Sequence, residues 1–257
     1  MSIYQHFRPE ERDFIDQVMN WKDHVENTFV AKVTDFLDPR EQQIVKTIIG
    51  TQADVKVEMF GGMPGAERQR ALIYPEYHQV DLEDYEICLF EVDYPSKFVT
   101  LEHPQVLGSL MSLGLKRGKF GDILLEQDRV QFFAAKEVSD YIMLQLDSIG
   151  RASISLREMP LSDVINVYIQ WNETSTTVSS LRLDTVLSAI HNISRQKSQL
   201  YINQGLVKVN WTTIENNAFE CGEGDILSAR GFGRAKIISI EGRTKKDKLR
   251  IIVGKQI

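Results

Sequence analysis

The stretch from Leu181 to Ile237 constrains the fold of this chain more than any other part of its sequence. It begins with two short segments in which apolar residues recur at helical spacing. Alternating runs of apolar residues follow, separated by turns that contain glycine. Many of its lysines and arginines lie where one element ends and the next begins. The pattern predicts two helices and a small sheet with cations at the turns, which is typical of a module that binds RNA.

The net charge of −6 hides a strong division along the chain. Of the 30 Lys+Arg and 36 Asp+Glu residues, residues 181–257 hold 13 and 7, which leaves 17 and 29 for residues 1–180. The C-terminal part therefore has a surplus of 6 positive charges, and the rest has a surplus of 12 negative charges. This asymmetry predicts that the C-terminal part binds a polyanion, whereas the acidic remainder repels phosphate.

The remaining composition favours a cytoplasmic protein. Cys88 and Cys221 are far apart in the sequence, so neither a disulfide framework nor a zinc site is expected. No apolar run approaches the roughly 20 residues that a membrane-spanning helix needs, and the N-terminus has no apolar signal-peptide core. We therefore expect no membrane contact. A heptad seam is also absent, and we expect a monomer.

Residues 1–82 are predicted to form a small α/β domain. One apolar stripe has spacings of four, three and four residues, as a helix face requires: Phe14, Val18, Trp21 and Val25. Asp38 and Glu41 match a capping box that opens a second helix. Two strands, Val55–Phe60 and Ala71–Tyr77, are expected on either side of a glycine-containing loop.

Residues 83–171 are predicted to form a second domain with the element order β-α-β-β-α-β. This split βαβ order is that of ferredoxin-like and RNA-recognition domains. A further strand over Val164–Gln170 is expected to extend its sheet. The polar run Asn172–Ser180 has the composition of a linker. The expected fold class is therefore α+β with several domains, the third of which covers residues 180–257.

In this third domain, Ser180 and Ser194 are expected to cap two helices, and Gly205 to end the second. Four short motifs carry a specific resemblance: Arg182-Leu183-Asp184, Ser194-Arg195, the run I-x-x-G-x-V-x-V-N from Ile202 to Asn210, and Gly224-Asp225. They resemble the alpha-L RNA-binding domain, which small-subunit ribosomal protein S-four, bacterial tyrosyl-tRNA synthetases, some pseudouridine synthases and a heat-shock ribosome-binding protein share. Ser198 departs from the alanine common in such domains. The whole chain resembles the YlmH family of bacterial RNA-binding proteins.

Cations at the starts of the two helices are the expected RNA contacts, because helix N-termini offer unpaired N–H groups and a positive dipole end to phosphate. The predicted RNA-binding residues are Arg182, Asp184, Ser194, Arg195, Lys197, Lys208, Asn210, Arg230, Arg234 and Lys236. The alternative is a solvated basic face on which Asp184 only pairs with Arg182.

Possible secondary RNA contacts lie in two glycine-containing loops: Arg68, Arg70, Lys116, Arg117 and Lys119. The first loop, Gly61–Arg70, lacks the Gly-Lys-Ser/Thr of a P-loop, and a tight connection is an equal alternative. The second loop is also consistent with a solvated turn. On the second domain, Phe90, Phe132 and Phe133 would stack bases if exposed, but the strand lacks the glycine of the RNA-recognition signature and core packing is expected.

The sequence gives little support for catalysis. The five histidines show no metal-ligand spacing, and no Gly-x-Ser-x-Gly motif is present. Arg-Leu-Asp also occurs at the catalytic centre of some pseudouridine synthases, but here Asp184 opens the first helix of the binding module and no synthase-sized domain follows. We therefore expect no enzymatic activity, cofactor, metal or small-molecule substrate.

The expected function is binding to structured rRNA or tRNA. The family resemblance implies a place on the large ribosomal subunit, translation quality control and the rescue of stalled complexes that carry peptidyl-tRNA. It also implies an association with the bacterial cell-division gene neighbourhood. Two alternatives remain: an RNA-modifying, pseudouridine-synthase-like enzyme, and a cell-division adaptor that binds proteins.

Overall fold

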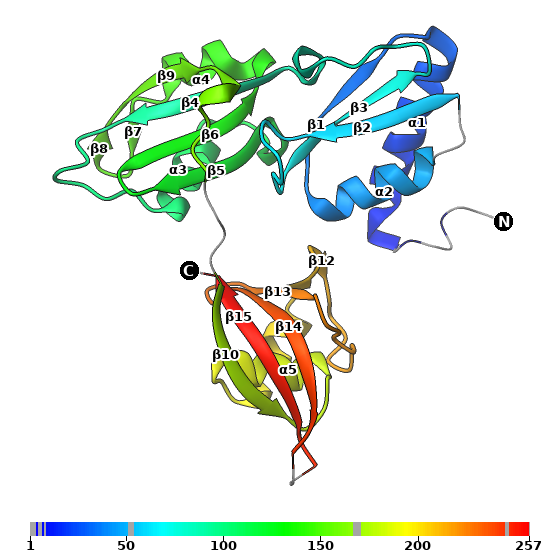
Figure 1. Cartoon of the computed structure of the whole chain (residues 1–257), viewed down its shortest axis with the longest axis vertical. Helices are drawn as coiled ribbons and strands as arrows, with labels where there is room; N and C mark the ends of the chain where they lie inside the picture. Colours follow the sequence, from blue (N-terminus) through cyan, green and yellow to red (C-terminus); the bar gives the residue numbers. More distant parts are fainter. Residues whose placement is uncertain are drawn as a thin grey trace. The chain divides into compact units, whose positions relative to one another are not determined.

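The computed structural model describes residues 4, 7, 9–50, 54–166, 171–244 and 247–256 (Figure 1). Its contacts divide the chain into two compact units, Met1–Val167 and Tyr168–Ile257. Each unit contains helices packed on antiparallel sheet. The expected α+β class with several domains is confirmed.

The first part of the N-terminal unit is a three-stranded antiparallel sheet of order β1-β3-β2, with two helices packed on it. Its elements are η2 (Pro9–Glu11), α1 (Arg12–Thr28), β1 (Lys32–Leu37), α2 (Pro39–Ile49), β2 (Val55–Phe60) and β3 (Gln69–Pro75). The predicted capping box is confirmed: Glu41 N donates to Asp38 Oδ1 over 2.9 Å, and Asp38 N donates to Glu41 Oε2 over 2.7 Å. Val18 and Val25 of the predicted apolar stripe are fully buried.

The second part has the predicted β-α-β-β-α-β order. Its main elements are β4 (Ile87–Asp93), α3 (His103–Ser112), β5 (Phe120–Glu126), β6 (Arg129–Ala135), α4 (Ser139–Gln145) and β9 (Ser155–Met159). Short elements connect them: η3 (Leu82–Tyr85), η4 (Arg117–Lys119), η5 (Lys136–Val138), η6 (Leu161–Asp163) and the hairpin of β7 (Ser148–Ile149) and β8 (Ala152–Ser153). The sheet order β5-β6-β4-β9, with antiparallel pairs throughout, is the ferredoxin-like order.

The prediction that Val164–Gln170 extends this sheet is wrong for the residues described. Val164–Asn166 form no strand, and residues 167–170 lie outside the described residues. Ile165 is buried, and its N–H donates to the side-chain oxygen of Gln131 over 2.9 Å. The backbone N–H of Ile165 is therefore satisfied by the buried side chain of Gln131 and not by a neighbouring strand.

Both faces of the ferredoxin-like sheet are covered. Phe90 and Phe132 stack at 5.3 Å in the core beneath α3 and α4. Phe133 points to the other face, where Phe36 of β1 packs against the sheet. These three rings are fully buried, as is Phe120 of β5. The expectation of core packing is confirmed, and these rings have no surface on which a base could stack.

The C-terminal unit is a six-stranded antiparallel sheet of order β10-β15-β14-β13-β11-β12. Its elements are β10 (Trp171–Val178), α5 (Leu183–His191), α6 (Arg195–Asn203), β11 (Val207–Val209), β12 (Thr212–Thr213), β13 (Ile226–Ala229), β14 (Gly233–Arg243) and β15 (Leu249–Gln256). Figure 1 shows α5 behind β10, β14 and β15. Both helices share one apolar core with the strands, so they cover one face of the sheet.

Two local predictions for this unit are wrong. The predicted linker 172–180 contains all of β10 except Trp171, and β10 pairs with β15 along its whole length. Its threonines suit a half-exposed edge strand despite their polarity. Ser180 does not cap α5; Arg182 occupies that position, and the Ser180 hydroxyl bonds to Thr185 Oγ1 at 3.4 Å. Ser194, in contrast, caps α6 as predicted by accepting from Lys197 N at 3.2 Å.

Substitution of Gly62 tests the packing between the two parts of the N-terminal unit. Gly62 has φ +97°, and a Cβ there would lie 2.4 Å from the ring of Phe133. Gly65, in the same loop, has φ +76° but open space around its Cα. We expect Gly62→Ala to lower the free energy of unfolding by about 1–3 kcal/mol more than Gly65→Ala, measured by denaturant titration. Equal losses would contradict this packing.

Candidate RNA interface

The C-terminal unit is organised around one buried carboxylate. Asp184 lies in the first turn of α5 and has no exposed surface. Its oxygens accept from Arg182 Nε over 3.3 Å, Arg195 Nε over 3.0 Å and Gln199 Nε2 over 2.9 Å. The arginine side chains remain 39% and 53% exposed respectively. Asp184 therefore fixes two guanidinium groups at the surface, one at the start of each helix.

The charge of Asp184 is stabilised by these donors. Burial alone raises the pKa of this carboxyl, but the hydrogen bonds from Arg182, Gln199 and Arg195 outweigh burial and hold the pKa well below its ordinary value. Because Asp184 is charged and inaccessible, the prediction that it contacts RNA is wrong. Its role is to position the two arginines, which includes the pairing with Arg182 that the sequence left open.

An aromatic cluster fixes a further cation beside α6. Lys197 Nζ lies 5.7 Å from the ring centroid of Phe232, which also packs against Tyr201 at 5.4 Å and His191 at 4.9 Å. The hairpin between β13 and β14, which carries the exposed Arg230, is thereby held against both helices. Burial, with a smaller contribution from Lys255, lowers the pKa of His191 to about 4, so His191 adds no positive charge at neutral pH.

Six of the seven predicted cations divide between two surfaces, and the seventh, Arg230, lies on the hairpin between β13 and β14. We name Arg182, Arg195 and Lys197 the helix surface. Three others alternate with core residues along β11 and β14 and point away from the helices. These are Lys208, Arg234 and Lys236, which we name the sheet surface. Lys208 and Arg234 lie in one row across the sheet, because both pair with Ser228.

Two of the predicted RNA-binding residues use their side chains within the fold. The Asn210 amide donates to Asp225 Oδ1 over 2.7 Å, and its oxygen accepts from Ile226 N over 2.9 Å. Ser194 uses its hydroxyl to cap α6. The Asn210 and Gly224-Asp225 motifs are thus parts of one turn structure.

The first glycine-containing loop of the N-terminal unit is a packed connection. The N–H groups of Glu67 and Arg68 donate to the carboxylate of Asp122 over 2.6 Å and 3.0 Å. These donors are therefore taken by a protein carboxylate in place of phosphate. Arg68 also donates through Nη2 to Phe36 O over 2.8 Å.

Arg70 is 2% exposed, and the structure contradicts its prediction as an RNA contact. Its Nε donates to Thr34 O over 2.6 Å, its Nη1 to Glu86 O over 2.7 Å, and Glu137 pairs with it at 3.5 Å. Its guanidinium joins the two parts of the N-terminal unit.

The second loop is also largely engaged. Arg117 Nη1 donates to Phe120 O over 2.6 Å. Lys119 Nζ forms ion pairs with Asp35 at 2.5 Å and Glu137 at 2.8 Å. Lys116, in contrast, is exposed. The internal contacts of these basic residues argue against a large phosphate-binding surface on this unit.

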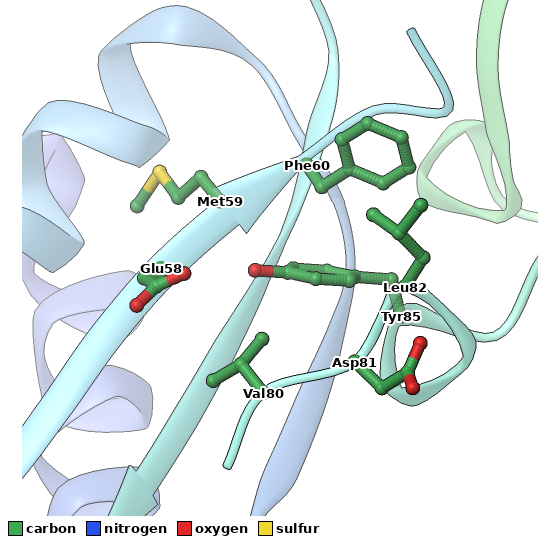
Figure 2. A pocket seen from close by; sticks show the side chains of 7 residues that line it. All are labelled: Glu58, Met59, Phe60, Val80, Asp81, Leu82 and Tyr85. Atoms are coloured by element: carbon green, nitrogen blue, oxygen red, sulfur yellow. The ribbon is translucent and has the colours of Figure 1, made fainter.

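A pocket of about 420 Å³ opens beside β2 (Figure 2). It is lined by Glu58, Met59, Phe60, Val80, Asp81, Leu82 and Tyr85. Two of these side chains are acidic and none is basic, so the pocket does not suit phosphate. Burial, aided by Glu58 and Asp84, raises the pKa of Tyr85 to about 12, and its phenol stays neutral at physiological pH.

The described residues hold no cluster of three or more His, Cys, Asp or Glu side chains suited to a metal ion. Cys88 and Cys221 are free and buried, and burial is the main cause that raises the pKa of each thiol to about 12. Neither is an activated nucleophile. Among the helices described, none has the length and apolar character to span a bilayer.

The fold and the two basic surfaces define a multidomain protein with a C-terminal RNA-binding module. Family models match residues 10–78 ("YlmH, N-terminal"), 81–163 ("Putative RNA-binding domain in YlmH") and 181–227 ("S4 domain"). A ribosome-associated protein quality control protein from Bacillus subtilis (strain 168) is 46% identical over 255 residues, or 99% of each chain. The chain belongs to the YlmH family, as the sequence motifs indicated.

A solved structure, the cell division protein ylmH from Streptococcus pneumoniae, is also similar. It is 34% identical with a TM-score of 0.55, and the match covers 64% of this chain and 100% of that chain.

Sequence reasoning missed Gln199, Phe232 and Trp211. Gln199 follows Arg195 by four residues on α6, and this spacing signals that they share a helix face. Phe232 lies between two glycines of a turn, where an aromatic residue is unusual. Trp211 follows Asn210 in the two-residue turn between β11 and β12.

Replacement of Asp184 tests the positioning role. We expect Asp184→Asn to lower the free energy of unfolding at pH 7 by roughly 1–3 kcal/mol, because charged hydrogen bonds become neutral ones. Since the folded-state pKa is lowered, the carboxylate stabilises the fold above its ordinary pKa of about 3.9 and loses this effect as the pH falls below it. Wild type should therefore lose more stability than the variant between about pH 5 and pH 3.

The control for this measurement is Asp247→Asn. Asp247 pairs with Arg243 at 2.6 Å, but both side chains are exposed. We expect a loss of at most about 1 kcal/mol. Equal effects of the two substitutions would show that burial of Asp184 has no special importance.

Proposed function

We propose that this protein binds structured rRNA or tRNA without catalysing a reaction, and that it docks on the large ribosomal subunit in ribosome-associated quality control. The observation that carries the proposal is the pair of arginines that Asp184 holds at the starts of α5 and α6. The name of the relative from Bacillus subtilis supports the ribosomal setting. We further propose that the protein is a cytoplasmic monomer that binds no membrane, cofactor or small-molecule substrate.

The geometry suits recognition of an RNA backbone. A guanidinium has five N–H donors, so Arg182 and Arg195 can bond Asp184 on one side and phosphate on the other. The N-termini of α5 and α6 add the positive end of each helix dipole. The first N–H groups of α5, those of Leu183 and Asp184, already donate to Phe219 O and Asn217 O within the fold. Because the deep major groove of folded RNA hides its bases, this surface would read shape and phosphate positions.

The division of charge along the chain determines which unit approaches RNA first. The surplus of positive charge is confined to residues 181–257, and the rest of the chain is strongly acidic. Phosphate is therefore attracted to the C-terminal unit and repelled by the acidic remainder. We propose that residues 1–82 and 83–171 form two domains that orient against RNA or protein once the C-terminal unit has docked, with Lys116 available as a secondary contact.

A second candidate function is that of a protein-binding adaptor. It is favoured by an exposed apolar group on the N-terminal unit: Phe29, Val30 and Tyr77 are 63%, 59% and 70% exposed. The Tyr77 hydroxyl donates to the backbone oxygen of Phe29 over 2.9 Å, which places the Tyr77 side chain beside Phe29. The cell-division name of the Streptococcus pneumoniae relative agrees with such a role.

Sedimentation of lysate through sucrose gradients tests RNA docking. We expect wild type to migrate with the large subunit at low salt and to leave it as salt rises, because binding releases counterions. Arg182→Glu with Arg195→Glu should remain at the top of the gradient. Since Asp184 would face new carboxylates there, a second pair, Lys197→Glu with Arg230→Glu, removes cations while leaving Asp184 paired. It should weaken co-migration without loss of fold by circular dichroism.

The matched control is Lys97→Glu with Arg151→Glu, which changes net charge equally on exposed sites of the N-terminal unit. It should migrate as wild type does. Wild type at the top of every gradient would overturn RNA docking. Co-migration that survives both C-terminal pairs would favour the adaptor function.

A further inference from the structure

The turn between β11 and β12 contains a tryptophan in a conformation that normally favours glycine. Val209 pairs directly with Thr212, which leaves Asn210 and Trp211 as a two-residue turn. Their φ angles are +47° and +64°, as in a type I′ turn. Such turns favour Asn-Gly, because a bulky side chain at positive φ is strained. The identity of residue 211 therefore needs an explanation other than turn geometry.

Packing does not supply that explanation. The apolar residues that border the core of this unit in the described structure do not include Trp211, and its side chain is partly exposed. The turn is held by other groups: Asn210 bonds through its side chain to Asp225 and Ile226, and Asn210 N donates to Ile226 O over 2.8 Å. The indole is thus not required to form the turn.

One cation of the sheet surface lies beside the indole, and the other two lie on the neighbouring strands. The Arg234 guanidinium lies 5.9 Å from the centroid of the Trp211 ring. Lys208 is exposed two residues before the turn and lies in one row with Arg234. Lys236 pairs across the sheet with Ile226, the residue to which Asn210 is bonded. An aromatic ring beside a basic sheet surface is an arrangement that binds unpaired nucleotides.

We propose that Trp211 is a stacking platform for an unpaired RNA base, and that Lys208, Arg234 and Lys236 bind the phosphates next to that base. The proposal rests on the proposed function and adds a second kind of recognition to it. The helix surface contacts the backbone of folded RNA, whereas Trp211 stacks on a base that is neither paired nor stacked within an RNA helix. Stacking tolerates any base, so the site selects a bulge, loop or single strand rather than a sequence.

The test compares two RNA duplexes of similar length and charge, both without loops or overhangs, one fully paired and one with a single unpaired adenosine. We expect Trp211→Gly to bind the duplex with the unpaired adenosine at least fivefold more weakly than wild type, and the paired duplex within twofold of wild type. The affinity of Trp211→Phe for the RNA with the unpaired adenosine should lie between those of wild type and Trp211→Gly, because phenylalanine keeps an aromatic ring. Quenching of tryptophan emission by the unpaired adenosine should be smaller in Trp211→Gly. All proteins are also titrated with purified large-subunit RNA.

Stability measurements separate stacking from folding. Because the turn favours glycine, Trp211→Gly should melt at or above the wild-type temperature. A lower melting temperature with equal loss on every RNA would mean that Trp211 is structural, and it would overturn the proposal. Unchanged affinity of Trp211→Gly for every RNA that wild type binds would overturn it while leaving the proposed function intact. If wild type binds no RNA at low salt, both the stacking proposal and the proposed function are overturned.

Discussion

The buried carboxylate of Asp184 is the interaction on which the basic helix surface depends. It takes hydrogen bonds from both arginines and from Gln199, so the starts of α5 and α6 are joined through one charged group. Removal of a buried partner leaves the other charges without compensation, which is more costly than loss of an exposed ion pair. Two flexible side chains thereby become a fixed pair of donors. Preorganisation of this kind reduces the entropy lost on binding.

In the N-terminal unit, charged side chains instead join the two parts of the unit to each other. Arg70, Lys119 and Asp122 connect the first sheet and its loop to the second sheet. The ring of Phe133 and the glycines beside it complete that junction. The sheet face that RNA-recognition domains leave open is therefore covered. The acidic pocket and the exposed apolar group of Phe29, Val30 and Tyr77 are two surfaces on which this unit can meet a partner.

Much of the fold could be predicted from the sequence, because local signals agreed with tertiary structure. The capping box at Asp38, the cap at Ser194 and the β-α-β-β-α-β order all depend on short-range patterns. The errors arose where long-range packing decided the outcome. The sequence of β10 resembles that of a linker because its exposed residues are polar. Its pairing with β15, which makes it a strand, is a long-range contact that the local sequence does not show. Burial likewise separates Arg70 and Asp184 from the exposed cations, and no sequence pattern reports burial of a charge.

The salt dependence of binding to purified large-subunit RNA tests the central claim most directly. If about 4–6 cations of the C-terminal unit each neutralise a phosphate, the logarithm of the binding constant should fall linearly with the logarithm of salt concentration, with a slope of about −3 to −5. Arg182→Ala with Arg195→Ala should reduce the magnitude of that slope by about 2. A slope near zero, or one that the two substitutions leave unchanged, would contradict the account.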